Sequence, residues 1–202
     1  MNKKISLPES INDITLYQYQ KYIALTKRED LDDLSFNKRL ICIFTDLKFR
    51  EVELISFKDY ESIIAQIMLA MTQDVEFQDR FTINGVEFGF IPNLEDITTG
   101  EYVDLSTHGM DIETLHKVMA VLFRPVSGED AFGNYKIETY QGTKQYSEVM
   151  KYTPLNIVNG ALVFFYNLSK ELKNHIQKST EAVQVKVNEL QAISKSGDGT
   201  LQ

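Results

Sequence analysis

The sequence predicts an α+β fold that is mainly helical: a helical body with a small antiparallel β-hairpin or three-stranded sheet, followed by a long C-terminal helix. Three observations predict it. Apolar residues recur at helical spacing in most segments. Residues 81–90 alternate apolar and polar side chains around Asn84-Gly85, a pair typical of a type I′ hairpin turn. An apolar stripe runs through the last third of the chain.

The predicted body spans residues 1–154, with its hairpin near 80–91. Its expected helices are 16–25 (after Asp13 or Thr15), 35–44 (starting at Ser35), 60–71 (capped by Ser56 or Asp59), 96–105, 113–123 and 146–150. Arg124-Pro125 is expected to end the helix over 113–123, because proline lacks a donor and disfavours helical geometry before it. Residues 135–140 alternate as a strand that could extend the hairpin into a three-stranded sheet, and residues 4–8 fit an edge strand or an extended arm.

The second predicted element is an amphipathic helix over residues 155–195, followed by a flexible tail over 196–202. Thr153-Pro154 supplies its N-cap and a proline at the first helical position. A helix from Leu155 to Ile193 is roughly 58 Å long, whereas a domain of this size has a radius of gyration of about 16–17 Å. We therefore expect the helix to overhang the body.

The apolar stripe of this helix has two interpretations. In one, the body buries the part from Leu162 to Leu168, which is apolar nearly all round, and the part from Ile176 to Ile193 emerges to bind a partner. In the other, the helix folds back on its own body as a core helix. The residues predicted to form a partner interface come from this helix and from the N-terminal arm: Ile176, Val183, Val187, Leu190, Ile5 and Leu7.

Charge and composition narrow the class of protein. The net charge of −8 argues against a protein whose main task is binding nucleic-acid phosphates. The part from Ile157 onward has five lysines against four acidic residues, so the first 156 residues carry a net charge of −9. No apolar stretch is long enough to cross a bilayer, and the N-terminus lacks the apolar region of a signal peptide. A single cysteine, Cys42, excludes an internal disulfide, fits a reducing cytoplasm and is expected to be a small buried hydrophobe.

The sequence predicts no catalytic site, cofactor site or metal site. Its three histidines, His108, His116 and His175, fall on different predicted elements and are expected to be solvated or partly buried. The ten glycines form no phosphate-binding loop. We therefore expect a non-enzymatic assembly protein.

Several stretches of the second half resemble a known family. They are Pro92–Leu105, Leu115–Val126, Tyr135–Gly142, and Pro154 together with Gly160–Leu168. Their order and spacing are similar to those of small structural proteins of tailed bacteriophages that infect Bacteroidota, the crAss-like phages among them. The resemblance covers roughly residues 91 to 172.

This resemblance implies a virion protein near the portal, neck or tail, or a protein that helps build one. We favour a ring or connector type that assembles in multiple copies with other phage proteins. The resemblance implies no cofactor and no catalytic residues. Two alternatives stay open: a tail-assembly chaperone that is absent from the mature particle, and a cargo protein packaged within it. All three are made in the host cytoplasm.

The predicted C-terminal interface can be tested with the double substitution Val183→Asp plus Val187→Asp. It should leave the body folded and block assembly, because it places two charges on the apolar stripe that we expect to bind the partner. Circular dichroism with thermal unfolding measures the first effect, and particle assembly measures the second. Global unfolding of the double variant would instead place the helix in the core of the monomer.

Overall fold

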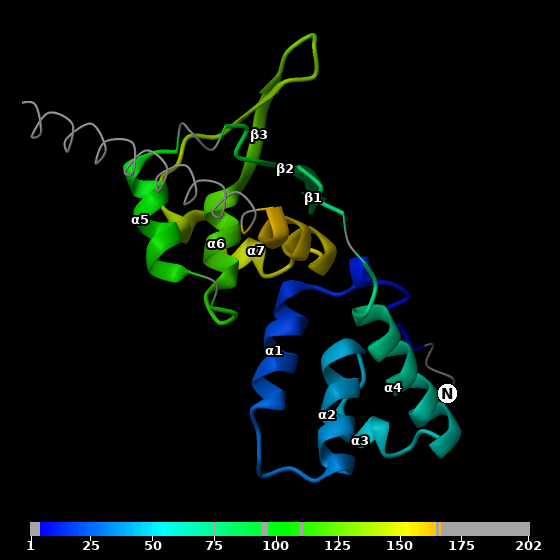
Figure 1. Ribbon diagram of the computed structural model, residues 1–202. Coiled ribbons are helices and arrows are strands. Elements are labelled where there is room, and N and C mark those ends of the chain that lie inside the picture. The colour runs from blue at the N-terminus through cyan, green and yellow to red at the C-terminus, as the bar shows by residue number, and fades with distance from the viewer. Residues whose placement is uncertain (1–4, 75, 94–96, 110, 165, 167–202) are drawn as a thin grey trace, which may run out of the picture. The chain divides into compact units, whose positions relative to one another are not determined.

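The computed structural model describes residues 5–74, 76–93, 97–109, 111–164 and 166, and its chain divides into two units, Met1–Ala161 and Leu162–Gln202 (Figure 1). Helices dominate the first unit and a four-stranded antiparallel sheet joins them, so the predicted α+β, mainly helical class is confirmed. Of the helix predicted over 155–195, residues 155–164 and 166 are helical. The remainder of that helix and the predicted tail lie outside the described residues.

The first part of this unit is helical. Its elements are the short 3-10 helix η1 (Ile11–Asp13), α1 (Leu16–Thr26), α2 (Asp33–Phe44), α3 (Phe49–Val52) and α4 (Phe57–Met71). In Figure 1 they run from blue to cyan-green, with α2 contacting α1, α3 and α4.

Side-chain caps decide where these helices begin. Thr15 accepts a hydrogen bond from the Gln18 amide and Gln18 accepts one from the Thr15 amide, which satisfies two donors at the start of α1. Ser56 caps α4, as one of the two predicted alternatives. The predicted start of α2 at Ser35 is wrong, because Asp32 accepts from the Ser35 amide at 2.7 Å and the helix begins at Asp33.

The predicted hairpin is confirmed as β1 (Arg80–Ile83) and β2 (Val86–Phe90). Asn84 and Gly85 have φ values of 51° and 79°, as a type I′ turn requires. After it come α5 (Thr99–His108) and α6 (Leu115–Leu122).

The expected helix over 113–123 needs a correction. It ends at Leu122, and the chain continues without a loop into a strand that the sequence did not predict, β3 (Phe123–Glu129). Phe123 pairs with Phe90 of β2, and Pro125 keeps its carbonyl in the sheet by accepting a hydrogen bond from Glu138. The predicted strand over 135–140 is present as β4 (Tyr135–Ile137), but it pairs with β3 rather than with the β1–β2 hairpin itself.

The rest of the unit closes the core. The chain passes through η3 (Thr143–Gln145) and α7 (Ser147–Met150) before the helical residues 155–161. All residues of α6 except Lys117 are buried, as expected for a helix that is apolar nearly all round. The Leu16 amide donates to Thr153, and the Leu155 amide donates to Ile14, so the two ends of the unit are hydrogen-bonded to each other.

A close backbone contact at Gly160 yields a stability prediction. A Cβ at Gly160 would lie 2.9 Å from the carbonyl oxygen of Glu76 and 3.0 Å from the Cα of Phe77. Alanine favours a helix over glycine by about 1 kcal/mol, but overpacking against backbone costs typically 1–3 kcal/mol. Gly160→Ala should therefore lower the free energy of unfolding by up to about 2 kcal/mol in urea titrations.

Gly128→Ala is the matched control, because nothing lies within 4 Å of the Cβ that it would add. It should change the free energy of unfolding by no more than about 0.5 kcal/mol. A Gly160→Ala chain that is more stable than the unmodified protein would contradict the close packing.

Candidate assembly interface

The two predicted interface residues of the N-terminal arm, Ile5 and Leu7, are both half-buried. Their stretch is extended but forms no strand, and Pro8 at its end is buried. The side-chain amide of Gln66 on α4 donates to the Pro8 carbonyl at 3.2 Å, and the Glu9 amide donates to Asp13. The arm is therefore fixed to its own body from Pro8 onward. A partner role for Ile5 and Leu7 stays a prediction.

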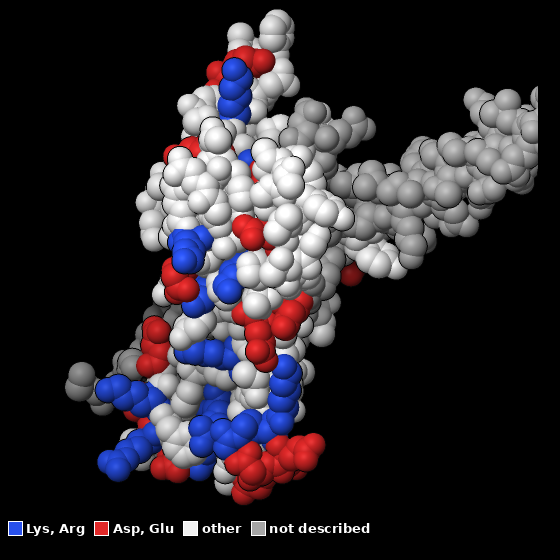
Figure 2. All heavy atoms as spheres, turned by 90° about the vertical axis from the view of Figure 1, so that its left-hand side faces the viewer, with Lys and Arg blue, Asp and Glu red and all other residues white. Residues whose placement is uncertain are grey.

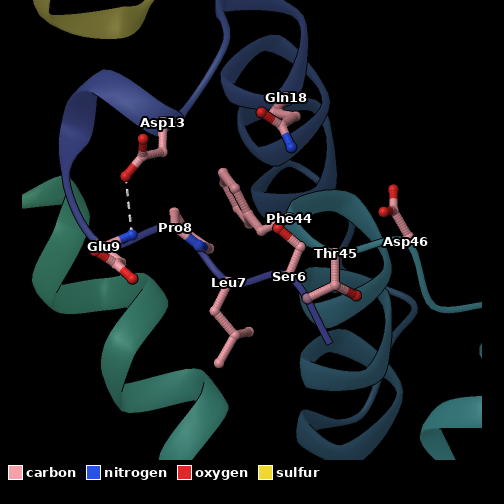
Figure 3. Close-up of a pocket in the computed structure, with 9 residues that line it drawn as sticks. All are labelled: Ser6, Leu7, Pro8, Glu9, Asp13, Gln18, Phe44, Thr45 and Asp46. Carbon is pink, nitrogen blue, oxygen red and sulfur yellow. Dashed lines mark hydrogen bonds between the residues drawn. The ribbon is translucent and has the colours of Figure 1, made fainter. Parts of the chain in front are cut away.

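A hollow of about 310 Å³ lies beside this arm. Figure 3 shows Leu7 and Pro8 on the arm, Gln18 on α1 and Phe44 at the end of α2 around it. Ser6, Glu9, Asp13, Thr45 and Asp46 complete the lining, so most of the contributing side chains are polar or acidic. Such a hollow does not suit an apolar partner segment.

The other four predicted interface residues, Ile176, Val183, Val187 and Leu190, lie outside the described residues. The helical residues just before them correct one expectation. Val163, Phe164 and Tyr166 are 58%, 37% and 62% exposed, so these three residues are not buried as the apolar composition of their stretch predicted. The last fully buried residue before it is Ala161.

A surface that the sequence did not single out is the tip of the β3–β4 hairpin. Phe132 at this tip is 90% exposed, the highest value among the large apolar side chains that the structure describes. The loop that carries it is ordered by one carboxylate. Asp130 accepts hydrogen bonds from the amides of Phe132 and Asn134 at 2.8 and 3.0 Å and from the Asn134 side chain at 2.9 Å.

Backbone geometry reinforces this loop. The Asp130 amide donates to the Asn134 carbonyl, and Gly133 adopts a φ of 85°, which L side chains rarely do. Hydrogen bonds from Asn134 and Phe132 also lower the pKa of the Asp130 carboxyl, so this group is ionised at neutral pH. The tip therefore presents an exposed aromatic ring beside a fixed negative charge.

One arginine fixes the base of the same hairpin. The guanidinium of Arg124, on β3, forms a buried ion pair with Glu101 of α5, with 2.6 Å between Nη1 and Oε1. Its Nε donates to the Glu138 carbonyl at 2.7 Å, and its Nη1 donates to the Val121 carbonyl at 3.0 Å. Arg124, itself on β3, thereby joins α5, the end of α6 and the residue that follows β4.

The Glu101 carboxylate is held in its ionised form. Burial by itself raises its pKa, but hydrogen bonds from Thr98 and Arg124 and the Arg124 charge outweigh burial, so the pKa of Glu101 is lower than usual. Its Oε2 also accepts from the Thr98 amide at 2.6 Å, which caps α5.

Two tyrosines complete this polar cluster. Tyr140 donates to Asp104 of α5, and its ring lies 5.4 Å from the Arg124 guanidinium carbon. Tyr146 donates to the Glu138 carboxylate. Burial and the acceptor carboxylate raise the pKa of both phenols, that of Tyr146 to about 12. Both therefore stay protonated donors, and their chemistry here is to position the hairpin.

A third tyrosine holds the hairpin from the side. The ring of Tyr135 lies across β2 at a point where a Cβ on Gly89 would come within 2.5 Å of it, so only glycine leaves room. Its hydroxyl donates to the Phe90 carbonyl at 2.9 Å. Arg80 lies over this ring at 4.8 Å and pairs with Glu129 at 3.1 Å.

An apolar hollow lies between α1, α2 and the start of α3. It measures about 550 Å³. Its apolar lining consists of Ala24, Leu25, Cys42, Ile43, Leu47 and Phe49, and its basic lining consists of Lys21, Arg28, Arg39 and Lys48. We call it the basic-rimmed hollow. Figure 2 shows lysine and arginine side chains on the lower half of the visible face, with aspartate and glutamate side chains among and below them.

Neither His116 nor Cys42 has the surroundings of a reactive site. His116 is buried rather than solvated, with Nδ1 3.2 Å from the Gln20 side-chain amide, and burial lowers its pKa. Cys42 is half-buried in the basic-rimmed hollow, and burial raises the pKa of its thiol. Within the described ranges, no three His, Cys, Asp or Glu residues gather where they could hold a metal ion.

Comparison with known proteins adds no relative. No protein-family model, curated protein or solved structure matches the chain. Among the helices that the structure describes, none combines the length and the apolar character needed to cross a membrane. The case for a function therefore rests on the surfaces described above and on the family resemblance of the sequence.

The Arg124–Glu101 pair leads to a prediction about stability and pH. Glu101→Gln should lower the free energy of unfolding at pH 7 by about 3 kcal/mol, because it leaves the buried Arg124 charge without its partner. Since the folded-state pKa of Glu101 is lowered, its contribution is complete above the ordinary pKa of 4.5 and is lost as the pH falls through the folded-state value. The difference between the two chains should therefore shrink on acidification.

Urea unfolding between pH 7 and pH 3 measures both effects. The matched control is Glu113→Gln, which removes an exposed partner of Lys27 and should cost at most about 1 kcal/mol. Equal losses for the two substitutions at pH 7 would contradict the assigned role of Glu101.

Proposed function

We propose that this chain is a non-enzymatic structural protein of a tailed bacteriophage particle, built into the neck or tail region in multiple copies as a ring or connector component. One observation carries the proposal. The β3–β4 hairpin holds Phe132 90% exposed on a loop that hydrogen bonds fix at the tip and the Arg124 cluster fixes at the base.

The energetics of that loop favour a binding role. Ordering the backbone of each residue costs roughly 1–2 kcal/mol, and an exposed phenylalanine gains nothing from burial in the monomer. A rigid, exposed aromatic residue is instead typical of the central residues of protein interfaces, which lose little entropy on binding because they are already ordered. The hairpin therefore suits a permanent contact with another virion subunit.

The family resemblance points the same way. It runs over residues 91–172 and so includes α5, α6 and the β3–β4 hairpin, the elements that Arg124 joins. A protruding element that enters a different surface of the next subunit makes a heterologous contact, and such contacts form rings when the rotation closes. The net charge of −8 argues that subunits, rather than nucleic-acid phosphates, are the partners.

Purified phage particles provide the test. We expect quantitative mass spectrometry to find this protein at a fixed ratio to the major capsid protein, corresponding to several copies per particle, because a ring needs several subunits. The ratio should stay unchanged after the particles eject their DNA. A non-virion phage protein of similar cellular abundance serves as the contamination control.

Two outcomes would contradict the proposal. Absence from particles, with presence in infected cells, would favour the assembly chaperone. Loss from particles together with the DNA would favour the packaged cargo protein.

A further inference from the structure

We infer that copies of this chain join head to tail, with Phe132 of one copy inserted into the basic-rimmed hollow of the next. The inference rests on the proposed function, which requires several copies, and it names the partner as a second copy of this chain and the two surfaces that meet. Both surfaces belong to the first unit.

The inserted element has a matched shape and charge. Phe132 stands out from the tip at 90% exposure, so it fills no hollow of its own subunit. One carboxylate of the loop, Asp130, lies two residues before it, whereas Glu129 at the end of β3 is already paired with Arg80. Asp130 keeps its negative charge, because its hydrogen bonds come from neutral donors.

The receiving element complements both features. The basic-rimmed hollow is an open depression of about 550 Å³, which is large enough for an aromatic side chain to enter. Leu25, Ile43 and Leu47 supply an apolar lining. Two exposed cations of its lining, Arg39 and Lys48, carry the charge opposite to that of Asp130.

The basic lining also suits an aromatic ring. Arg39 already lies 5.8 Å from the ring of Phe49, within the distance at which a cation attracts the face of an aromatic ring. An incoming phenylalanine ring would find the same kind of neighbour. Lys21, Arg28, Arg39 and Lys48 surround this hollow in a chain with a net charge of −8, and although Arg28 already pairs with Asp30, such a lining suits an acidic, aromatic tip.

The geometry of the contact has a consequence that can be measured. Because the tip and the hollow are different surfaces, each copy uses one of each, and the contact does not stop at two copies. Disabling the tip in one chain and the hollow in another leaves a single functional contact between them. The mixture should then stop at a heterodimer.

The test uses two variants of the full chain. Phe132→Asp removes the aromatic ring from the tip. Ala24→Glu adds bulk and negative charge to the hollow at an exposed position of α1, and glutamate is nearly as good a helix former as alanine. Each should raise the dissociation constant for the next copy roughly ten- to hundredfold, as expected for losing one buried aromatic residue. Light scattering across a concentration series measures this change.

Matched controls distinguish the contact from general stickiness. Leu54→Asp changes another strongly exposed apolar residue, and Ala65→Glu changes an exposed alanine of α4 that does not line the hollow. Neither should alter association. Phe132→Asp and Ala24→Glu mixed in equal amounts should form a 1:1 dimer, although each alone is a monomer at that concentration.

Three results would overturn the inference. One is a mixture that stays monomeric while the unmodified chain associates. Another is an equal loss of association in the two control variants. The third is an unmodified chain that stays monomeric at its highest soluble concentration although particles contain many copies. In that case the contact between Phe132 and the basic-rimmed hollow is wrong, but the proposed function stands.

Discussion

The buried guanidinium of Arg124 is the constraint on which the described architecture depends. It contacts Glu101 of α5, the last turn of α6 and the carbonyl of Glu138 where the chain leaves β4. A buried ion pair gains little net free energy, because removing two charges from water offsets their attraction. Its contribution here is geometric: α5, the end of α6 and the chain after β4 all meet at one planar group, which restricts how they can be arranged. That arrangement sets the direction in which the β3–β4 hairpin leaves the body.

The β3–β4 hairpin is ordered from its base to its tip. Arg124 fixes its base, Tyr135 fixes its side against Gly89, and Asp130 fixes its loop. Each of these polar groups has a partner within the chain. Phe132, by contrast, is 90% exposed. Because the hairpin around this uncovered aromatic ring is already ordered, a contact there would not have to meet the additional entropic cost of ordering the loop.

Local signals in the sequence predicted much of the fold, and long-range pairing produced the rest. Thr15 and Ser56 act as caps, and Asn84-Gly85 turns the hairpin, because each depends on residues within four positions. The strand β3 was missed because its first residues continue the apolar pattern of α6, and only pairing with Phe90 shows that Phe123 is a strand residue. The candidate interface was harder still. A single exposed aromatic residue produces no periodic pattern in the sequence. Nothing near Arg124 in the sequence indicates Glu101 as its partner.

Charge affects how copies of this chain can associate. Two molecules that each carry a net charge of −8 repel at long range, and salt screens that repulsion over about 8 Å at physiological ionic strength. A local match of carboxylates at a hairpin tip with cations around a hollow acts within that distance, but exposed ion pairs contribute little affinity. The burial of an aromatic ring must therefore supply the affinity, and the charges select the orientation. Added salt should therefore lower the affinity of such a contact only a little, since it weakens the local attraction and the general repulsion together.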